Sequence, residues 1–200
     1  STVDANGCAD SQKDTDSDGV TDDLDTCADT PSGETADNSG CSDSQKDSDG
    51  DGYDDLEDNC IFVAGNSTAD RTGCVDTDGD GYSDVTVPTN TTVGWDITDG
   101  ADAFPIEVSQ WADQDGDGYG DNASGFEADD CPTEEGYSNI GLFGCPDDDN
   151  DGTAQSSDAF PSDSTQWSDI DGDGFGDNPN GTTPDACPNV VGPSTIDRYG

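Results

Sequence analysis

The sequence has 200 residues, of which 49 are Asp or Glu and 4 are Lys or Arg, so its formal net charge is −45 at pH 7. Only 28% of the residues are apolar, which is too few for a single large hydrophobic core. The charge excludes nucleic acid as a partner, and the lack of a long apolar run excludes a membrane-spanning helix.

The first predicted element is an Asp-rich loop over residues 14–25. Counted as a twelve-residue cation loop, it has acids at positions 1, 3, 5, 9 and 12, a backbone carbonyl at position 7, and Gly19 at position 6 for a sharp turn. Such hard oxygen ligands suit Ca²⁺, and the chain has no His or Met to favour a softer metal. The expected ligands of loop one are Asp14, Asp16, Asp18, Val20, Asp22 and Asp25.

Five further loops follow in the same register. Loop two has the ligands Asp47, Asp49, Asp51, Tyr53, Asp55 and Asp58. Loop three has an insertion at 85–99 and the ligands Asp76, Asp78, Asp80, Tyr82, Asp84 and Asp102. Loops four and six each have a shorter insertion after position 9, with the ligands Asp113, Asp115, Asp117, Tyr119, Asp121 and Asp129, and Asp169, Asp171, Asp173, Phe175, Asp177 and Asp185. Loop five is expected to be the weakest because Gln155 stands at position 9, and its ligands are Asp147, Asp149, Asp151, Thr153 and Asp158.

The linkers between loops are equally regular. Three are bracketed by cysteines 14 residues apart, which predicts the disulfides Cys27–Cys41, Cys60–Cys74 and Cys131–Cys145 and an oxidising, extracellular setting. Metal thiolates are the alternative, but no Cys-x-x-Cys and no His occurs. We call these linkers the disulfide joints. The other two, the aromatic joints, run from Phe104 to Trp111 and from Phe160 to Trp167, where a Phe–Trp contact is expected to replace the disulfide.

The remaining cysteines, Cys8 and Cys187, have no partner at this spacing. Residues 1–7 lead into Cys8 as residues 34–40 lead into Cys41, and residues 194–200 align with residues 1–7 without a gap. We therefore expect both cysteines to pair outside the segment, in a longer repetitive array or in an identical copy joined head to tail, which would generate an open filament.

Four Asn-x-Ser/Thr sequons are candidates for glycosylation. One lies in a linker and three lie in loop insertions, all of which are expected at the surface. They are Asn66, Asn90, Asn122 and Asn180.

The predicted fold is mostly irregular: an elongated tandem array of Asp-rich calcium loops, stapled by disulfides and Phe–Trp contacts. Gly, Pro, Asn and Asp recur too often for long periodic elements, so only short helical turns at Asp22–Asp25 and Asp54–Asp58 and isolated bridges are expected. The expected divisions are 1–74 with two Cys-stapled repeats, 75–130 with loops three and four, and 131–200 with loops five and six.

The motif Asp-x-Asp-x-Asp-Gly-x-x-Asp, followed by Asp-x-Cys, resembles the thrombospondin type 3 repeat of bacterial and archaeal surface proteins. The resemblance covers nearly the whole chain. It implies a calcium-wrapped rod with little regular structure and often more than one ion per repeat. The insertions, the aromatic joints and the lack of a Cys within the loop depart from the animal pattern.

These features favour a calcium-binding structural protein, a rod, stalk or fibril segment at the cell surface that holds about six or more Ca²⁺ ions. One alternative is an adhesin whose insertion 85–99, with Trp95, contacts a partner. Another is an extracellular calcium buffer or mineral-binding coat. No enzyme is expected: the chain has no His, and bound calcium would keep the carboxylates ionised.

Overall fold

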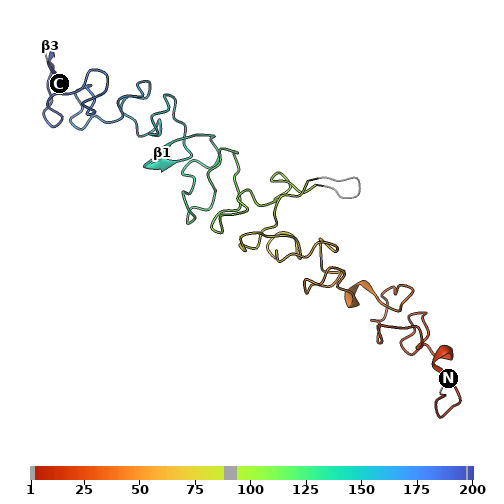
Figure 1. Cartoon of the computed structure of the whole chain (residues 1–200). Coiled ribbons are helices and arrows are strands. Elements are labelled where there is room, and N and C mark those ends of the chain that lie inside the picture. Colours follow the sequence, from red (N-terminus) through yellow and green to blue (C-terminus); the bar gives the residue numbers. More distant parts are fainter. Residues whose placement is uncertain (1–2, 88–93, 197) are drawn as a thin grey trace. The chain divides into compact units, whose positions relative to one another are not determined.

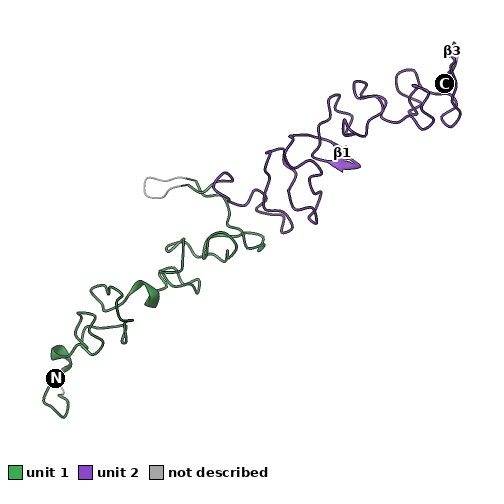
Figure 2. Cartoon of the chain, turned by 180° about the vertical axis from the view of Figure 1, so that it is seen from behind, with its two compact units in different colours: residues 1–95 green, residues 96–200 purple. Residues whose placement is uncertain are grey.

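A computed structural model describes residues 3–87, 94–196 and 198–200. The chain forms two compact units, Ser1–Trp95 and Asp96–Gly200 (Figure 2). The division into three parts that we expect from the sequence stays a prediction. Within the described ranges, no helix has the length and apolar character needed to cross a membrane.

Regular secondary structure is sparse in both units, as predicted (Figure 1). The first unit has two single-turn 3-10 helices, η1 (Asp10–Gln12) and η2 (Asp43–Gln45). The second has two very short antiparallel hairpins, β1 (Asn139–Ile140) with β2 (Leu142–Phe143), and β3 (Thr195–Ile196) with β4 (Arg198–Tyr199). Apart from these elements and isolated bridges, the described residues form turns, bends and irregular segments.

The two 3-10 turns were not expected from the sequence. In η2, the side chain of Gln45 accepts the backbone N–H of Ser42 at 3.1 Å and so satisfies an N–H at the start of the turn. The helical turns that were expected are present as short hydrogen-bonded turns, each with two bonds to one carbonyl. The N–H groups of Glu57 and Asp58 donate to the carbonyl of Asp54 at 3.0 and 2.9 Å. Neither continues, because a joint begins at the following cysteine.

The residues that the structure describes form no large hydrophobic core. The buried apolar residues are all small: Ala9, Cys41, Cys74, Ala101, Cys145 and Ala154. The largest fully buried side chains are instead polar, led by Gln110 and Gln166. Buried apolar area therefore cannot be the main source of stability, and hydrogen bonds and disulfides must supply more of it.

The disulfide joints form as the cysteine spacing predicts. Cys27–Cys41, Cys60–Cys74 and Cys131–Cys145 have Cα–Cα distances of 5.0, 5.1 and 5.1 Å. A covalent link that closes a loop of this length typically stabilises a fold by about 3 kcal/mol. Cys8 and Cys187 carry free thiols.

The aromatic joint from Phe160 to Trp167 has a polar side chain at its centre, and the Phe–Trp contacts stay a prediction. Trp167 keeps 44% of its surface exposed, so its ring is not the buried centre of its joint. That place belongs to Gln166, which is 1% exposed. Its Nε2 donates to the carbonyls of Asn178 and Thr182 at 3.1 and 3.0 Å, and its Oε1 accepts the N–H of Asn178 at 2.9 Å.

Candidate metal centres

The first half of every loop folds around the carboxylate at position 1. Its two oxygens accept the backbone N–H groups of positions 4 and 6, at 2.7–2.9 Å and 2.8–3.1 Å respectively. The glycine at position 6 has a φ of +90° to +103° in all six loops, a conformation that a side chain would strain. The six position-6 glycines are Gly19, Gly52, Gly81, Gly118, Gly152 and Gly174.

The second half of each loop is fixed by the residues at positions 5 and 9. The carboxylate at position 5 accepts the N–H of position 7 at 2.8–3.0 Å, which orients the peptide whose carbonyl was expected as a ligand. The N–H of position 9 donates to the carbonyl of the residue before the loop at 2.7–2.9 Å. Gln155 of loop five makes this bond too, and its side chain accepts the N–H of Asp148 at 3.4 Å, as Asp55 accepts that of Ser48 at 2.8 Å.

The residue at position 12 leads into the joint in the same way each time. One carboxylate oxygen, Oδ1, accepts the N–H of the residue two positions later, at 2.6–2.9 Å, and that residue is the first Cys or the Phe of the joint. This bond also forms after the insertions of loops four and six. In loop four, the N–H of Asp129 donates to the carbonyl of Gly120 at 2.9 Å and brings the chain back into register.

The carboxylates at positions 1, 3 and 5 converge. Six groups of at least three acidic residues have ligand atoms within 4.8 Å of one another, and five of them are 14, 16, 18; 47, 49, 51; 76, 78, 80; 113, 115, 117; and 147, 149, 151. In loop six, Asp169, Asp171 and Asp173 accept the same loop hydrogen bonds. Two carboxylates at this distance repel by roughly 3 kcal/mol at an effective dielectric constant of about 20, so a cation between them is strongly favoured.

Buried oxygens point to the same conclusion. In every loop, at least one carboxylate oxygen is buried and accepts no hydrogen bond from the part of the chain that the structure describes. These oxygens belong to Asp18, Asp49, Asp78, Asp80, Asp115, Asp121, Asp129, Asp149, Asp151, Asp171, Asp177 and Asp185. Burying a charged acceptor without a partner is costly, and an ion is the partner that satisfies several such oxygens at once. The residues therefore fit Ca²⁺, which takes six to eight oxygen ligands.

Seven of the loop carboxylates have a raised pKa and are therefore harder to ionise without a cation. Burial, reinforced by the neighbouring Asp117 and Asp115, raises the pKa of Asp129 to about 6. The pKa values of further loop carboxyls are raised, with burial as the largest cause in each: Asp58, Asp80, Asp115, Asp149, Asp158 and Asp171. A bound cation would reverse this effect, since it favours the charged form.

The structure places Asp102 in the second unit, where its Oδ1 accepts the N–H of Phe104 at 2.7 Å. The other ligands of loop three, residues 76–84, belong to the first unit. The assignment of Asp102 to loop three stays a prediction.

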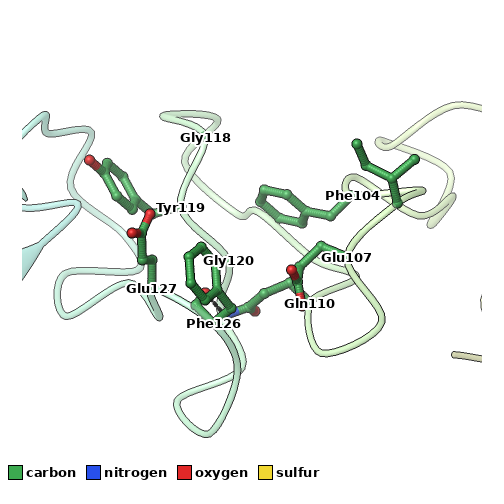
Figure 3. A pocket seen from close by; sticks show the side chains of 9 residues that line it. Phe104, Glu107, Gln110, Gly118, Tyr119, Gly120, Phe126 and Glu127 are labelled. Atoms are coloured by element: carbon green, nitrogen blue, oxygen red, sulfur yellow. Dashed lines mark hydrogen bonds between the residues drawn. The ribbon is translucent and has the colours of Figure 1, made fainter. Parts of the chain in front are cut away.

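The role of Gln110 was missed in the sequence. Gln110 is 1% exposed and makes the same bonds as Gln166: it donates to the carbonyls of Asn122 and Phe126, both at 3.2 Å. It forms the floor of a cavity of about 320 Å³, bordered by the rings of Phe104, Tyr119 and Phe126 (Figure 3). The signal was available, because both Gln-Trp motifs precede loops with a five-residue insertion, and the glutamine bridges that insertion.

Only the base of the insertion 85–99 lies within the described residues. There Thr86 and Trp95 form an antiparallel bridge, and the guanidinium carbon of Arg71 lies 5.1 Å from the centre of the Trp95 ring. This distance suits a cation–π contact. Trp95 is therefore engaged with its own unit rather than fully exposed.

The sequons differ in their surroundings. Asn66 and Asn180 are exposed. Asn122 is half-buried, and its Nδ2 donates to the carbonyl of Ser109 at 2.7 Å. Asn90 lies outside the described residues.

No protein-family model matches this chain, and no curated protein matches it. The structure itself shows repeated Asp triads in a mostly irregular, disulfide-linked chain, and this arrangement is consistent with calcium-binding repeats. The three disulfides indicate an oxidising environment.

Proposed function

We propose that the protein is a calcium-dependent structural element, a segment of an extracellular rod, stalk or fibril. The observation that carries the proposal is the recurrence of one hydrogen-bond pattern in six loops, each with buried carboxylate oxygens that lack a donor among the described residues. Bound calcium would fix the turns that a low apolar content cannot fix. Because each loop bonds mainly to its own joint, the repeats would form a quasi-one-dimensional stack.

The test is the size of the chain with and without calcium. With a net charge of −45, the metal-free chain should expand strongly, and small-angle scattering in calcium and after chelation should record a larger radius of gyration without the ion. Addition of Mg²⁺ at the same ionic strength is the control for simple screening. An unchanged radius after chelation would remove calcium from the explanation of the fold.

We extend the proposal to assembly through Cys8 and Cys187. The segment before Cys8 is bonded like a joint: Asp4 donates its N–H to the carbonyl of Cys8 at 2.9 Å, as Asp37 does to Cys41 at 2.9 Å. The segment after Cys187 repeats the one after Cys131, including the hairpin β3–β4 in place of β1–β2. Each cysteine would then pair with one outside these 200 residues, in an adjoining repeat or another copy. Mass spectrometry of unreduced native material should find both oxidised, and free thiols at both positions would defeat this extension.

A second candidate function is adhesion. It is favoured by the apolar surface near the base of the insertion, where Phe62 is 83% exposed beside a cavity of about 340 Å³. Such exposed apolar residues can mark a contact with a partner. If these apolar residues contact a partner, Phe62→Ser should abolish attachment of the protein to that partner while calcium binding stays intact. Equal attachment of the variant and the parent protein would exclude it.

A further inference from the structure

The disulfide joints share a contact that the calcium loops alone do not explain. The residue before the second cysteine of each joint is a glycine with left-handed φ: Gly40 at +81°, Gly73 at +73° and Gly144 at +67°. A Cβ at each would overlap Oδ1 of the position-12 carboxylate of the preceding loop, namely Asp25, Asp58 and Asp129. The glycine backbone thus lies directly against the last expected ligand of the loop.

The same oxygen is held from the other side of the joint. Oδ1 of Asp129 accepts the N–H of Cys131 at 2.7 Å, while Gly144, the neighbour of Cys145, packs against it. The Cys131–Cys145 disulfide ties these two segments together at a Cα–Cα distance of 5.1 Å. The carboxylate is therefore clamped by the residues on both sides of the disulfide.

The clamp leaves the second oxygen for a ligand. Asp129 is only 6% exposed, and its Oδ2 is buried without a hydrogen-bond partner in the described residues. An unpartnered oxygen on so deeply buried a carboxylate points to a cation, and the carboxylates at positions 1, 3 and 5 of the same loop converge on one another. Gly144 and the N–H of Cys131 thus immobilise one carboxylate oxygen and leave the other for an ion, and the disulfide ties together the two segments that carry them.

The aromatic joints lack this arrangement. The residue before Trp167 is Gln166, whose side chain bonds to the insertion of the following loop, at Asn178 and Thr182. The position-12 residue of loop five, Asp158, accepts the N–H of Phe160, but no glycine precedes a cysteine there. Loop five therefore serves as an internal control, because no disulfide joint holds its position-12 carboxylate.

We propose that Gly40, Gly73 and Gly144 are positioning residues that couple each disulfide to the calcium loop before it, so that closing the joint strengthens calcium binding. By reciprocity, calcium then favours the oxidised joint by the same factor. The inference rests on the proposed calcium function and adds to it a redox dependence for loops one, two and four, but not for loop five.

The test compares two glycines of one linker in the full, oxidised chain. Gly144→Ala places a methyl group against Asp129, whereas Gly141→Ala, at a φ of +81° with nothing within 4 Å, imposes similar backbone strain without the contact. Native mass spectrometry during a calcium titration should show one ion bound about tenfold more weakly, or lost, in Gly144→Ala, a factor within the usual range of coupling. Gly141→Ala should bind all ions as the parent chain does.

A second readout does not depend on ion counting. In a glutathione redox buffer, thiol trapping gives the oxidised fraction of Cys131 and Cys145, and calcium should raise their disulfide equilibrium constant about tenfold in the parent chain and in Gly141→Ala. In Gly144→Ala, calcium should raise this equilibrium constant much less. If both variants behave alike while the parent chain binds calcium, the coupling is wrong and the proposed function stands. If the parent chain binds no calcium, the proposed function itself fails.

Discussion

Asp185 accepts the N–H of Cys187 through Oδ1 at 2.6 Å, the same bond that Asp58 makes to Cys60 although loop two has no insertion. The five additional residues of loop six are absorbed by a bridge between Gly176 and Pro184, after which the N–H of Asp185 donates to Gly176 at 2.8 Å. The insertion is thus a side loop that leaves the register of the twelfth position unchanged.

Asp185→Asn is therefore expected to cost one bound ion or to weaken one site, because it removes a ligand charge and leaves a poorer ligand. Ions bound per chain should be counted by native mass spectrometry in excess calcium. Asp148→Asn, at an exposed position 2 of loop five, removes the same charge without touching an expected ligand. Equal ion counts for both variants would show that the position-12 assignment is wrong.

The aromatic joint gives a second prediction. Gln166→Ala leaves the partly buried carbonyls of Asn178 and Thr182 without their donor and should lower the free energy of unfolding by about 1 kcal/mol in calcium. Trp167→Ala should cost less, since much of that ring is already in water. Thermal unfolding of the two variants tests the order. A larger loss of unfolding free energy for Trp167→Ala would show that the aromatic contact, and not Gln166, stabilises the joint most.

Calcium binding by loop four should depend on pH. In the metal-free fold, burial and neighbouring carboxylates raise the pKa of Asp129 from 3.8 to about 6. Between these values the folded chain holds a proton that the unfolded chain releases, so the stability of the metal-free loop falls as pH rises through this window. A proton and a cation compete for the carboxylate, so affinity should be about tenfold weaker at pH 5 than at pH 7. Carboxyl NMR of Asp129 at several calcium concentrations measures both effects, and a metal-free pKa near 4 would contradict them.

The sequons should not be used equally. Asn66 and Asn180 are exposed, whereas Nδ2 of Asn122, the atom that would carry a glycan, donates to Ser109. Glycopeptide mass spectrometry of native material should therefore find higher occupancy at Asn66 and Asn180 than at Asn122. The reverse order would mean that modification precedes folding of this joint.

Much of this architecture could be predicted from the spacing of Asp, Gly and Cys residues in the sequence alone. The loop register and the pairing of Cys27, Cys60 and Cys131 follow from local periodicity, because each loop and joint closes within a few turns of chain. The spacing of the two Gln-Trp motifs marks these glutamines, but their burial and their bonding partners could not be predicted from it. Glutamine is usually exposed, and the groups that Gln110 bonds lie 12 and 16 residues away in an insertion with no periodic pattern. The contact between Gly144 and Asp129 was hidden for a similar reason, since it depends on a φ value and not on a side chain.

The hydrogen bonds between loops and linkers join residues that are close to each other in the sequence. Gly65 reaches back 14 residues to Asp51, and Gly136 reaches back 19 residues to Asp117. If the protein is exported, as the proposed function requires, each repeat can complete its own bonds before the next one is released, because local contacts of this kind form quickly. In a low-calcium compartment, electrostatic repulsion would keep the chain extended and easy to thread, and the first encounter with a calcium-rich medium would fold it one repeat at a time in the direction of its release.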